Sequence, residues 1–255
     1  MRYQEDSQLE KKNILVTGAS SGLGREIAIT CSEAGANVAL VGRNIDTLQK
    51  TLSQMEDGNH HCYSCDVTDG DAYDNLFNSI KDDMGLVSGF VHSAGIEITL
   101  PLRASSAEIY RKTIEVNTIA ALELSRYAVK KKYKAESLSI IFIASTMGIT
   151  GAPALTAYSA SKGALIAAAR STALEYADKG VRFNCISPGH VEGTQMANSL
   201  FEKLPEKAKE DLIANHPLGL GQPRDIGNAS IFLLSNSSRW ITGSNLIVDG
   251  GYSAR

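Results

Sequence analysis

Short apolar runs alternate along the chain with longer stretches in which apolar residues recur every three or four positions. The runs lie at residues 13–16, 38–41, 89–92, 139–144, 182–186 and 246–248, with one more leading into Asp66. Runs of this length predict buried strands. The longer stretches, such as the one marked by Leu48, Leu52 and Met55, predict helices between the strands.

Glycines mark the ends of several of these helices. The first helix should stop at Gly35, the second at Asp57-Gly58 and the third, which begins near Tyr73, at Gly85. Further helices are expected over residues 106–134, from the region of Tyr158 to residue 178, and over residues 225–235.

Strands that alternate with helices predict a doubly wound α/β fold, with a parallel sheet of about seven strands and helices on both faces. Residues 1–12 form a polar lead-in. No linker, low-complexity segment or internal repeat interrupts the rest. We therefore expect residues 13–255 to form one dinucleotide-binding and catalytic domain.

A glycine-rich segment, residues 17–24, follows the first strand and opens the first helix. Gly18, Gly22 and Gly24 are spaced Gly-x-x-x-Gly-x-Gly. Glycines let a backbone turn tightly against a pyrophosphate, and the amides at the start of a helix meet its charge. A plain strand-to-helix turn would need one glycine rather than three.

Other polar or glycine-containing segments follow the remaining strands. These are Arg43, Asp66, residues 93–95, Ser145 and Pro188-Gly189. Ligands of parallel α/β sheets bind beyond the carboxyl ends of the strands, so this convergence predicts a ligand site there.

Tyr158 and Lys162 are four residues apart and should lie on one face of a helix. A nearby ammonium favours the phenolate, so we expect Lys162 to lower the pKa of Tyr158 and make it a usable acid or base. Tyr127 and Lys131 have the same spacing on what resembles an ordinary solvated helix. The assignment of function to Tyr158 therefore depends on its surroundings.

The composition limits the classes of function. With 43% hydrophobic residues, 21% charged residues and a net charge of −3, a nucleic-acid binder is not indicated. No apolar run has the length of a membrane span, and the charged first residues do not resemble a signal peptide. Four scattered cysteines suggest a reducing compartment, so we expect a cytoplasmic protein. Residues 60–65 resemble a metal cluster, but no second ligand pair follows, so no metal site is expected.

Together these motifs resemble the short-chain dehydrogenase/reductase family over nearly the whole chain, in its 3-oxoacyl-carrier-protein reductase branch and the sugar- and steroid-acting relatives. The resemblance implies a Rossmann-type fold and a catalytic tetrad of Asn117, Ser145, Tyr158 and Lys162. Ser145 precedes Tyr158 by thirteen residues, whereas Ile114 occupies that place before Tyr127. The cofactor contacts implied by the resemblance, besides Tyr158 and Lys162, are Gly18, Ser20, Ser21, Gly22, Leu23, Gly24, Arg43, Asn44, Asp66, Val67, Ser93, Ala94, Gly95, Pro188, Gly189, Val191 and Thr194.

The chain departs from the family pattern after the fourth strand. The family usually has Asn-Asn-Ala-Gly where this chain has His92-Ser93-Ala94-Gly95. Ser93 has a shorter reach than asparagine. Thr194 is expected to contact the carboxamide of the cofactor. It follows Gly193, which resembles an insertion relative to the family pattern.

NADP(H) is expected in preference to NAD(H). Enzymes of this fold that use NAD commonly carry an acid at the end of the second strand, where this chain has Gly42. Arg43 could bind a 2′-phosphate through two hydrogen bonds. Ser21 stands where many NADP-using relatives carry a second basic residue, so NAD(H) stays open.

The mechanism implied by the resemblance interconverts a carbonyl and a secondary alcohol. Ser145 would polarise the carbonyl, Tyr158 would transfer the proton, Lys162 would hold the nicotinamide ribose, and Asn117 would position a water. Alternatives are a sugar or steroid alcohol dehydrogenase that uses NAD, and a cofactor-sensing binding protein without turnover.

The substrate should be a small carbonyl or alcohol compound, free or bound to a carrier protein. Its pocket is expected from residues 96–102, 146–157 and 190–216, which are mostly apolar. A basic patch near the mouth of the site could receive an acidic carrier: Lys130, Lys131, Lys132, Lys134 and Lys179. The alanine-rich Tyr158 helix and the family resemblance predict a homotetramer.

Overall fold

The computed structural model describes residues 8–194, 197, 201 and 205–254. Its seven strands form one parallel sheet in the order β3-β2-β1-β4-β5-β6-β7. The strands are β1 (Asn13–Thr17), β2 (Asn37–Gly42), β3 (His61–Ser64), β4 (Val87–His92), β5 (Lys134–Ile143), β6 (Val181–Pro188) and β7 (Asn245–Val248). The prediction of a doubly wound parallel sheet is confirmed.

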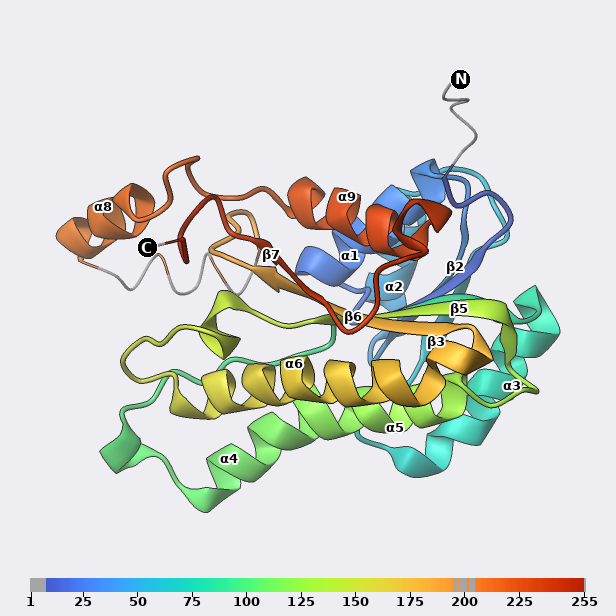
Figure 1. Cartoon of the computed structure of the whole chain (residues 1–255), viewed down its shortest axis with the longest axis horizontal. Coiled ribbons are helices and arrows are strands. Elements are labelled where there is room, and N and C mark those ends of the chain that lie inside the picture. Colours follow the sequence, from blue (N-terminus) through green and yellow to red (C-terminus); the bar gives the residue numbers. More distant parts are fainter. Residues whose placement is uncertain (1–7, 195–196, 198–200, 202–204, 255) are drawn as a thin grey trace.

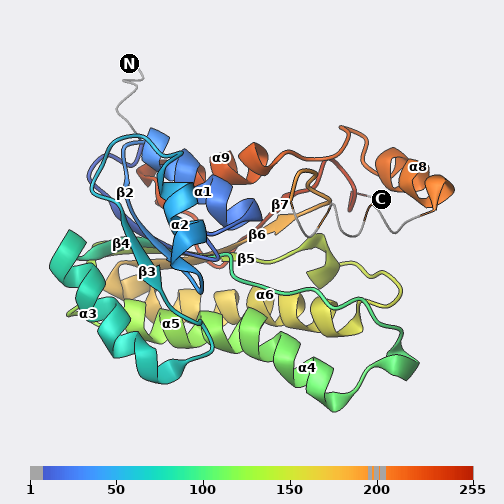
Figure 2. The same cartoon turned by 180° about the vertical axis from the view of Figure 1, so that it is seen from behind.

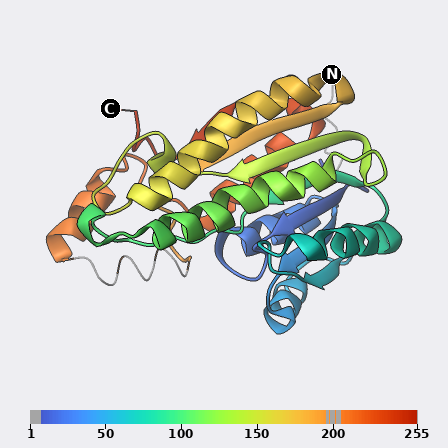
Figure 3. The same cartoon turned by 90° about the horizontal axis from the view of Figure 1, so that it is seen from below.

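Helices cover both faces of the sheet, as Figure 1 and the reverse view in Figure 2 show. The helices are α1 (Gly22–Glu33), α2 (Ile45–Leu52), α3 (Tyr73–Met84), α4 (Ala107–Ile114), α5 (Ala120–Ala128), α6 (Thr156–Tyr176), α8 (Glu206–Ala214) and α9 (Pro223–Leu234). A π-helical turn, η3 (Glu115–Ile119), joins α4 to α5. In Figure 3, α4, α5 and α6 run across one face of the sheet.

The two faces of the sheet bury separate apolar clusters. In β1, Ile14 and Val16 pack into the cluster under α1 and α9, whereas Leu15 packs into the cluster under α3, α5 and α6. Successive side chains of a strand point to opposite faces, so a strand buried on both faces becomes a continuous apolar run. The sequence pattern has this form because both faces are covered.

The helix predicted over residues 106–134 is interrupted and ends early. The α5 helix stops at Ala128, and β5 already begins at Lys134, which pairs with Val87. The reason lies in the core, because Tyr133 is 1% exposed and packs its ring against Phe77. Continuing the helix would pull Tyr133 out of that cluster.

The lead-in is partly built into the fold. Leu9 is fully buried and its N–H donates to the carbonyl of Ala34, at 3.0 Å. The Lys12 ammonium donates to the carbonyl of Leu234, also at 3.0 Å. The division at residue 12 stays a prediction. Within the described ranges, no helix has the length and apolar character needed to cross a membrane.

Candidate active site

The glycine segment forms a tight turn that touches the end of β4. Gly18 has a φ of +68°, a conformation that disfavours any side chain with a Cβ. A Cβ on Gly18 would lie 2.8 Å from the amide nitrogen of Ala94. A Cβ on Gly24 would overlap the carbonyl oxygen of Gly18. The turn therefore closes only with glycine at both positions.

The start of α1 fits a phosphate group. Ser21 has extended geometry and gives no side-chain cap, and within the described residues no hydrogen bond reaches the amides of Gly22 and Leu23. These amides and the helix dipole are free to meet an anion. Arg25 steadies the turn by donating to the Ser20 carbonyl at 2.5 Å and to the Thr51 hydroxyl at 3.2 Å. The loop thus fits the pyrophosphate of a dinucleotide.

Thr194 approaches this turn from a segment far along the chain. A Cβ built on Gly22 would lie 3.7 Å from the Cβ of Thr194, which is 8% exposed. The neighbouring Val191 pairs with Gly221 in an isolated bridge. The loop after β6 thus lies against the start of α1, as the sequence predicted from the carboxyl ends of the strands.

Arg43 and Asp66 lie near each other at the ends of β2 and β3. The Asp66 carboxylate accepts hydrogen bonds from the Thr68 N–H, at 2.9 Å, and the Thr68 hydroxyl, at 2.7 Å. These bonds, and more weakly the Arg43 charge, lower the pKa of Asp66. The Asn44 side chain caps α2 by accepting from the Thr47 amide, at 3.2 Å. Arg43 is exposed, so its guanidinium is accessible to a ligand.

Tyr158 and Lys162 lie on α6 and are 8% and 4% exposed. The Lys162 ammonium donates to the carbonyl of Ile143, at 2.8 Å, and lies 5.6 Å from the centre of the Tyr158 ring. Ser145, just beyond the end of β5, lies close enough to the Tyr158 hydroxyl to act on its pKa. Its Oγ also accepts the Met147 N–H at 3.1 Å. The three side chains therefore meet at one end of β5.

Asn117 connects three segments of the site. Its Oδ1 accepts from the Ile96 N–H at 2.8 Å, and its Nδ2 donates to the Ile96 carbonyl and the Ser161 hydroxyl, both at 2.9 Å. A Cβ on Gly95 would lie 3.2 Å from Oδ1 of Asn117 and 3.4 Å from Nζ of Lys162. The π-helical turn, the loop after β4 and α6 are thus locked together.

The expected effect of Lys162 on Tyr158 is wrong for this structure. The pKa of Tyr158 is raised above its usual value, first by burial and then by the negative charge of Glu97, while the Ser145 hydrogen bond acts in the opposite direction. Burial lowers the pKa of Lys162 to about 8. Desolvation of the phenolate is the largest cause, and the Lys162 ammonium, which donates to the Ile143 carbonyl, does not offset it.

His92 replaces the family's first asparagine and lies fully buried. Its Nδ1 is 3.2 Å from the Thr17 hydroxyl, which also accepts from the Ala94 N–H at 3.3 Å. Within the described residues, its Nε2 has no hydrogen-bond partner. Burial and the Lys162 charge lower the pKa of His92 to about 3, so the ring is neutral at physiological pH. Ser93 and Ala94 follow it at the end of β4, and Ser93 is half-buried there.

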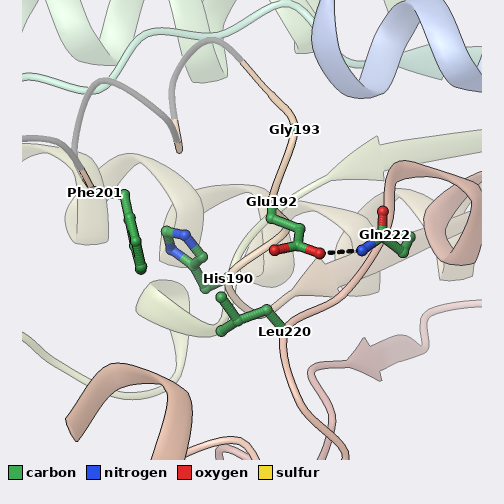
Figure 4. Close-up of a pocket in the computed structure, with 6 residues that line it drawn as sticks. All are labelled: His190, Glu192, Gly193, Phe201, Leu220 and Gln222. Atoms are coloured by element: carbon green, nitrogen blue, oxygen red, sulfur yellow. Dashed lines mark hydrogen bonds between the residues drawn. The ribbon is translucent and has the colours of Figure 1, made fainter. Parts of the chain in front are cut away.

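A pocket of about 270 Å³ lies beyond the end of β6, past Pro188 and Gly189 (Figure 4). In Figure 4, the His190 ring faces that of Phe201, and the Glu192 carboxylate accepts a hydrogen bond from the Gln222 amide. Gly189 fits closely, since a Cβ there would lie 2.9 Å from the Cα of Asp249. This is the region where sequence predicted a substrate pocket; Met196 and part of the same stretch lie outside the described residues.

The basic patch predicted at the mouth of the site lies at the opposite edge of the sheet. Lys130, Lys131 and Lys132 precede β5, and Lys179 precedes β6, whereas Ser145 and Gly189 follow these strands. The ten residues of β5 separate the two edges by roughly 30 Å. Lys130 lies 3.4 Å from the centre of the Tyr127 ring. Tyr127 is 8% exposed, so the helix that carries it is not merely solvated.

Sequence reasoning did not single out three residues that the structure brings into the site, although one of them, Glu97, lies in the predicted pocket stretch 96–102. Arg25 fixes the glycine turn, and Ser161 receives the amide of Asn117. Glu97 interacts electrostatically with both Tyr158 and Lys162. Glu97 could have been found, because it is a charged residue just beyond the carboxyl end of a buried strand.

Known protein families and solved structures resemble this chain over nearly its whole length. The family model described as enoyl-(acyl carrier protein) reductase matches residues 18–253. The 3-oxoacyl-[acyl-carrier-protein] reductase of Thermotoga maritima is 32% identical over 96% of this chain and 98% of its own. The 2-dehydro-3-deoxy-D-gluconate 5-dehydrogenase of Pseudoalteromonas atlantica is also 32% identical, over 98% and 99% of the two chains.

A solved dehydrogenase/reductase from Sinorhizobium meliloti superposes with a TM-score of 0.89 at 26% identity, covering 97% of each chain. A solved protein from Burkholderia xenovorans, described as a short-chain dehydrogenase/reductase, superposes with a TM-score of 0.92 at 31% identity. The match covers 97% of this chain and 98% of its own. With these matches over nearly its full length, the chain belongs to the short-chain dehydrogenase/reductase family and is an oxidoreductase acting on alcohol or carbonyl groups.

Proposed function

We propose that the chain is an NADP(H)-dependent oxidoreductase that interconverts a small carbonyl compound and a secondary alcohol, with Tyr158 as the acid and base. The observation that carries the proposal is the meeting of Tyr158, Ser145 and Lys162 beside the loop of Gly95, at the edge of the sheet where the glycine turn lies. A bound nicotinamide supplies or accepts the hydride.

Tyr158 is suited to hold and deliver a proton. Its raised pKa keeps the phenol protonated at neutral pH, which favours donation to a carbonyl oxygen over removal of an alcohol proton. The Ser145 oxygen accepts from the Met147 N–H, so its single hydroxyl proton is not used in that bond and stays free to donate. That proton can turn from Tyr158 to the substrate oxygen and polarise the carbonyl.

Lys162 and Asn117 would position the groups around the Tyr158 proton. The Lys162 ammonium donates to the Ile143 carbonyl at 2.8 Å and lies 5.6 Å from the centre of the Tyr158 ring, and its remaining protons would bind a ribose hydroxyl. The Asn117 side-chain amide is already hydrogen-bonded to Ile96 and Ser161, so its role is to hold the loop after β4 against α6. The water that the family resemblance assigns to Asn117 would then have to bind elsewhere on the π-helical turn, such as at a backbone carbonyl.

Replacing Tyr158 with phenylalanine tests the proposal. Turnover of an activated diketone with NADPH should fall by about 10²-fold or more, because only the transferable proton is removed, while NADPH affinity stays near the wild-type value. Tyr127→Phe is the matched control, because Tyr127 has the same lysine spacing without a serine thirteen residues before it. A Tyr158→Phe variant that keeps most of the wild-type rate would show that another group is the acid.

The preference for NADP(H) is supported by the end of β2. Gly42 has no side chain to repel a 2′-phosphate, and the exposed Arg43 follows it. A Cβ on Gly42 would lie 3.6 Å from Oγ of Ser20 and 3.2 Å from a methyl of Leu48. An acid placed there would therefore face the glycine turn, after a small shift of a flexible side chain.

Gly42→Asp combined with Arg43→Ile should shift the ratio of kcat/KM toward NADH, because it adds a repulsive carboxylate and removes the guanidinium. Arg43→Ile alone serves as the control that separates the two effects. A wild-type ratio that favours NADH would mean that Arg43 does not read the phosphate.

A second candidate, a polyol or sugar-acid dehydrogenase, is favoured by the relative named 2-dehydro-3-deoxy-D-gluconate 5-dehydrogenase. The relative named 3-oxoacyl-[acyl-carrier-protein] reductase supports a carrier-bound substrate instead. The pocket between His190 and Gln222 would belong to either substrate, and a panel of ketones and alcohols separates the two.

We also propose a homotetramer. β7 is an edge strand with Ile247 44% exposed, and nearby Trp240 is 91% exposed. On α6, Leu174 is 85% exposed, and Ala160 and Ala167 face outward. Apolar side chains exposed at a sheet edge and on a helix whose exposed residues include small alanines favour burial against other copies of this chain. Light scattering that shows a stable monomer at micromolar concentration would contradict this.

A further inference from the structure

We propose that Glu97 is a specificity-determining residue that contacts the substrate, selecting neutral hydroxylated carbonyl compounds over substrates with a carboxylate close to the reacting carbon. This inference rests on the proposed oxidoreductase function. It adds a residue outside the tetrad and the cofactor loop, and it assigns a chemical class to the substrate.

The loop that carries Glu97 is anchored on both sides of this residue. It follows Ile96, whose N–H and C=O are both bound by Asn117, at 2.8 and 2.9 Å. Three residues further on, the Leu100 N–H donates to the Ala154 carbonyl at 2.9 Å. The loop that carries Glu97 is therefore tied at one end to the π-helical turn and at the other to the segment between Ser145 and α6.

The Glu97 carboxylate is incompletely satisfied. Oε1 accepts the Thr99 hydroxyl at 3.2 Å, and among the described residues no hydrogen-bond donor or cation within 4.0 Å serves Oε2. The side chain is half-buried, and burial raises its pKa above the ordinary value. A partly buried carboxylate oxygen that has no protein donor can accept a hydrogen bond from a substrate hydroxyl.

The charges around Glu97 define what can approach it. Lys162 and Glu97 carry opposite charges, and both interact electrostatically within the site that contains Tyr158. Their sum is near neutral, so the site has no surplus positive charge to hold an anion. A second carboxylate beside the reacting carbon would meet Glu97 as a like charge in a poorly hydrated setting.

Three small ketones test the inference with NADPH: acetoin, which carries a hydroxyl next to the carbonyl; 2-butanone, which lacks it; and acetoacetate, which is anionic. For the wild type we expect kcat/KM to be highest for acetoin and lowest for acetoacetate. Glu97→Gln should raise the kcat/KM for acetoacetate, relative to that for acetoin, by tenfold or more, because it removes the repulsion between the two carboxylates. Glu97→Leu should in addition abolish the preference for acetoin over 2-butanone.

Glu108→Gln, an exposed carboxylate on α4, is the matched control and should leave all three ratios unchanged. Glu97→Asp should restore part of the wild-type order, and a thermal melt of each variant separates a loss of fold from a change of preference. Ratios that stay within twofold of the wild type in Glu97→Gln and Glu97→Leu, while the wild type turns over, would overturn the role of Glu97 alone. A folded wild type that reduces the activated diketone but none of these three ketones would overturn this inference and leave the proposed function standing, whereas one that reduces neither would refute both.

Discussion

Replacing Lys162 with methionine should stabilise the folded protein while it abolishes turnover. Lys162 is 4% exposed, and burial lowers its pKa from 10.5 to about 8. At about 1.4 kcal/mol for each pH unit, carrying this charge costs roughly 3 kcal/mol of folding free energy at neutral pH. Methionine is of similar length and removes that cost, but it loses the charge-assisted hydrogen bond to the Ile143 carbonyl, worth about 2 kcal/mol. We expect a net gain of about 1 kcal/mol.

This gain should depend on pH in a defined direction. The unfolded chain keeps the lysine proton up to the ordinary pKa of 10.5, while the folded protein releases it near 8. The unfolded state therefore binds more protons between these values, and wild-type stability rises with pH there. The cost is complete below the folded pKa and is relieved toward the unfolded one. The advantage of Lys162→Met should shrink by about 2 kcal/mol between about pH 7 and pH 10.

Urea unfolding followed by far-ultraviolet circular dichroism measures both effects, at one fixed protein concentration and without cofactor. Lys50→Met, at an exposed position of α2, is the control and should show no such pH-dependent difference. If Lys162→Met were less stable than wild type at neutral pH, and the difference did not change with pH, the ammonium would not be desolvated as its position implies.

Two further predictions concern residues on the end of β4 and the turn it touches. Gly18→Ala should lower the free energy of unfolding by at least about 2 kcal/mol and weaken NADPH binding, because the residue has a positive φ and its Cβ would crowd Ala94. Thermal melts measure the stability and fluorescence titration measures the NADPH affinity. An unchanged melting temperature would contradict the prediction. His92→Asn should reduce acid sensitivity, because the folded pKa of about 3 lies below the ordinary 6.5 and wild-type stability falls as the pH drops below 6.5. Between about pH 6.5 and 5 the variant should lose about 2 kcal/mol less than wild type, and equal losses in urea titrations would argue against a buried neutral ring.

The predicted order of strands and helices agrees with the structure because it depends on local regularities. Leu15 packs on one face of the sheet and Ile14 and Val16 on the other, so a strand buried on both faces has to be apolar throughout. Gly18 and Gly24 identify the cofactor turn for a similar reason, since only glycine fits the backbone there. Both signals are properties of neighbouring residues.

The boundaries and the edge of the sheet depended on distant contacts. The end of α5 is set by the packing of Tyr133 on Phe77, a residue of α3, which no pattern near Tyr133 reveals. The lysines before β5 were placed at the wrong edge, although a helix that precedes a parallel strand ends at the amino edge of the sheet. That polarity was available from the sequence order alone.

The sequence by itself determined the fold class, the family and the main polar segments at the carboxyl edge of the sheet, because repeating patterns and motif spacing carry that information. Only the tertiary structure decided the electrostatics of the site. Whether Lys162 lowers the pKa of Tyr158 depends on how deeply both groups are buried and on Glu97, a residue from another loop. Burial and the distance between charges are set by the packing of segments remote in the chain, so spacing along α6 could not reveal them.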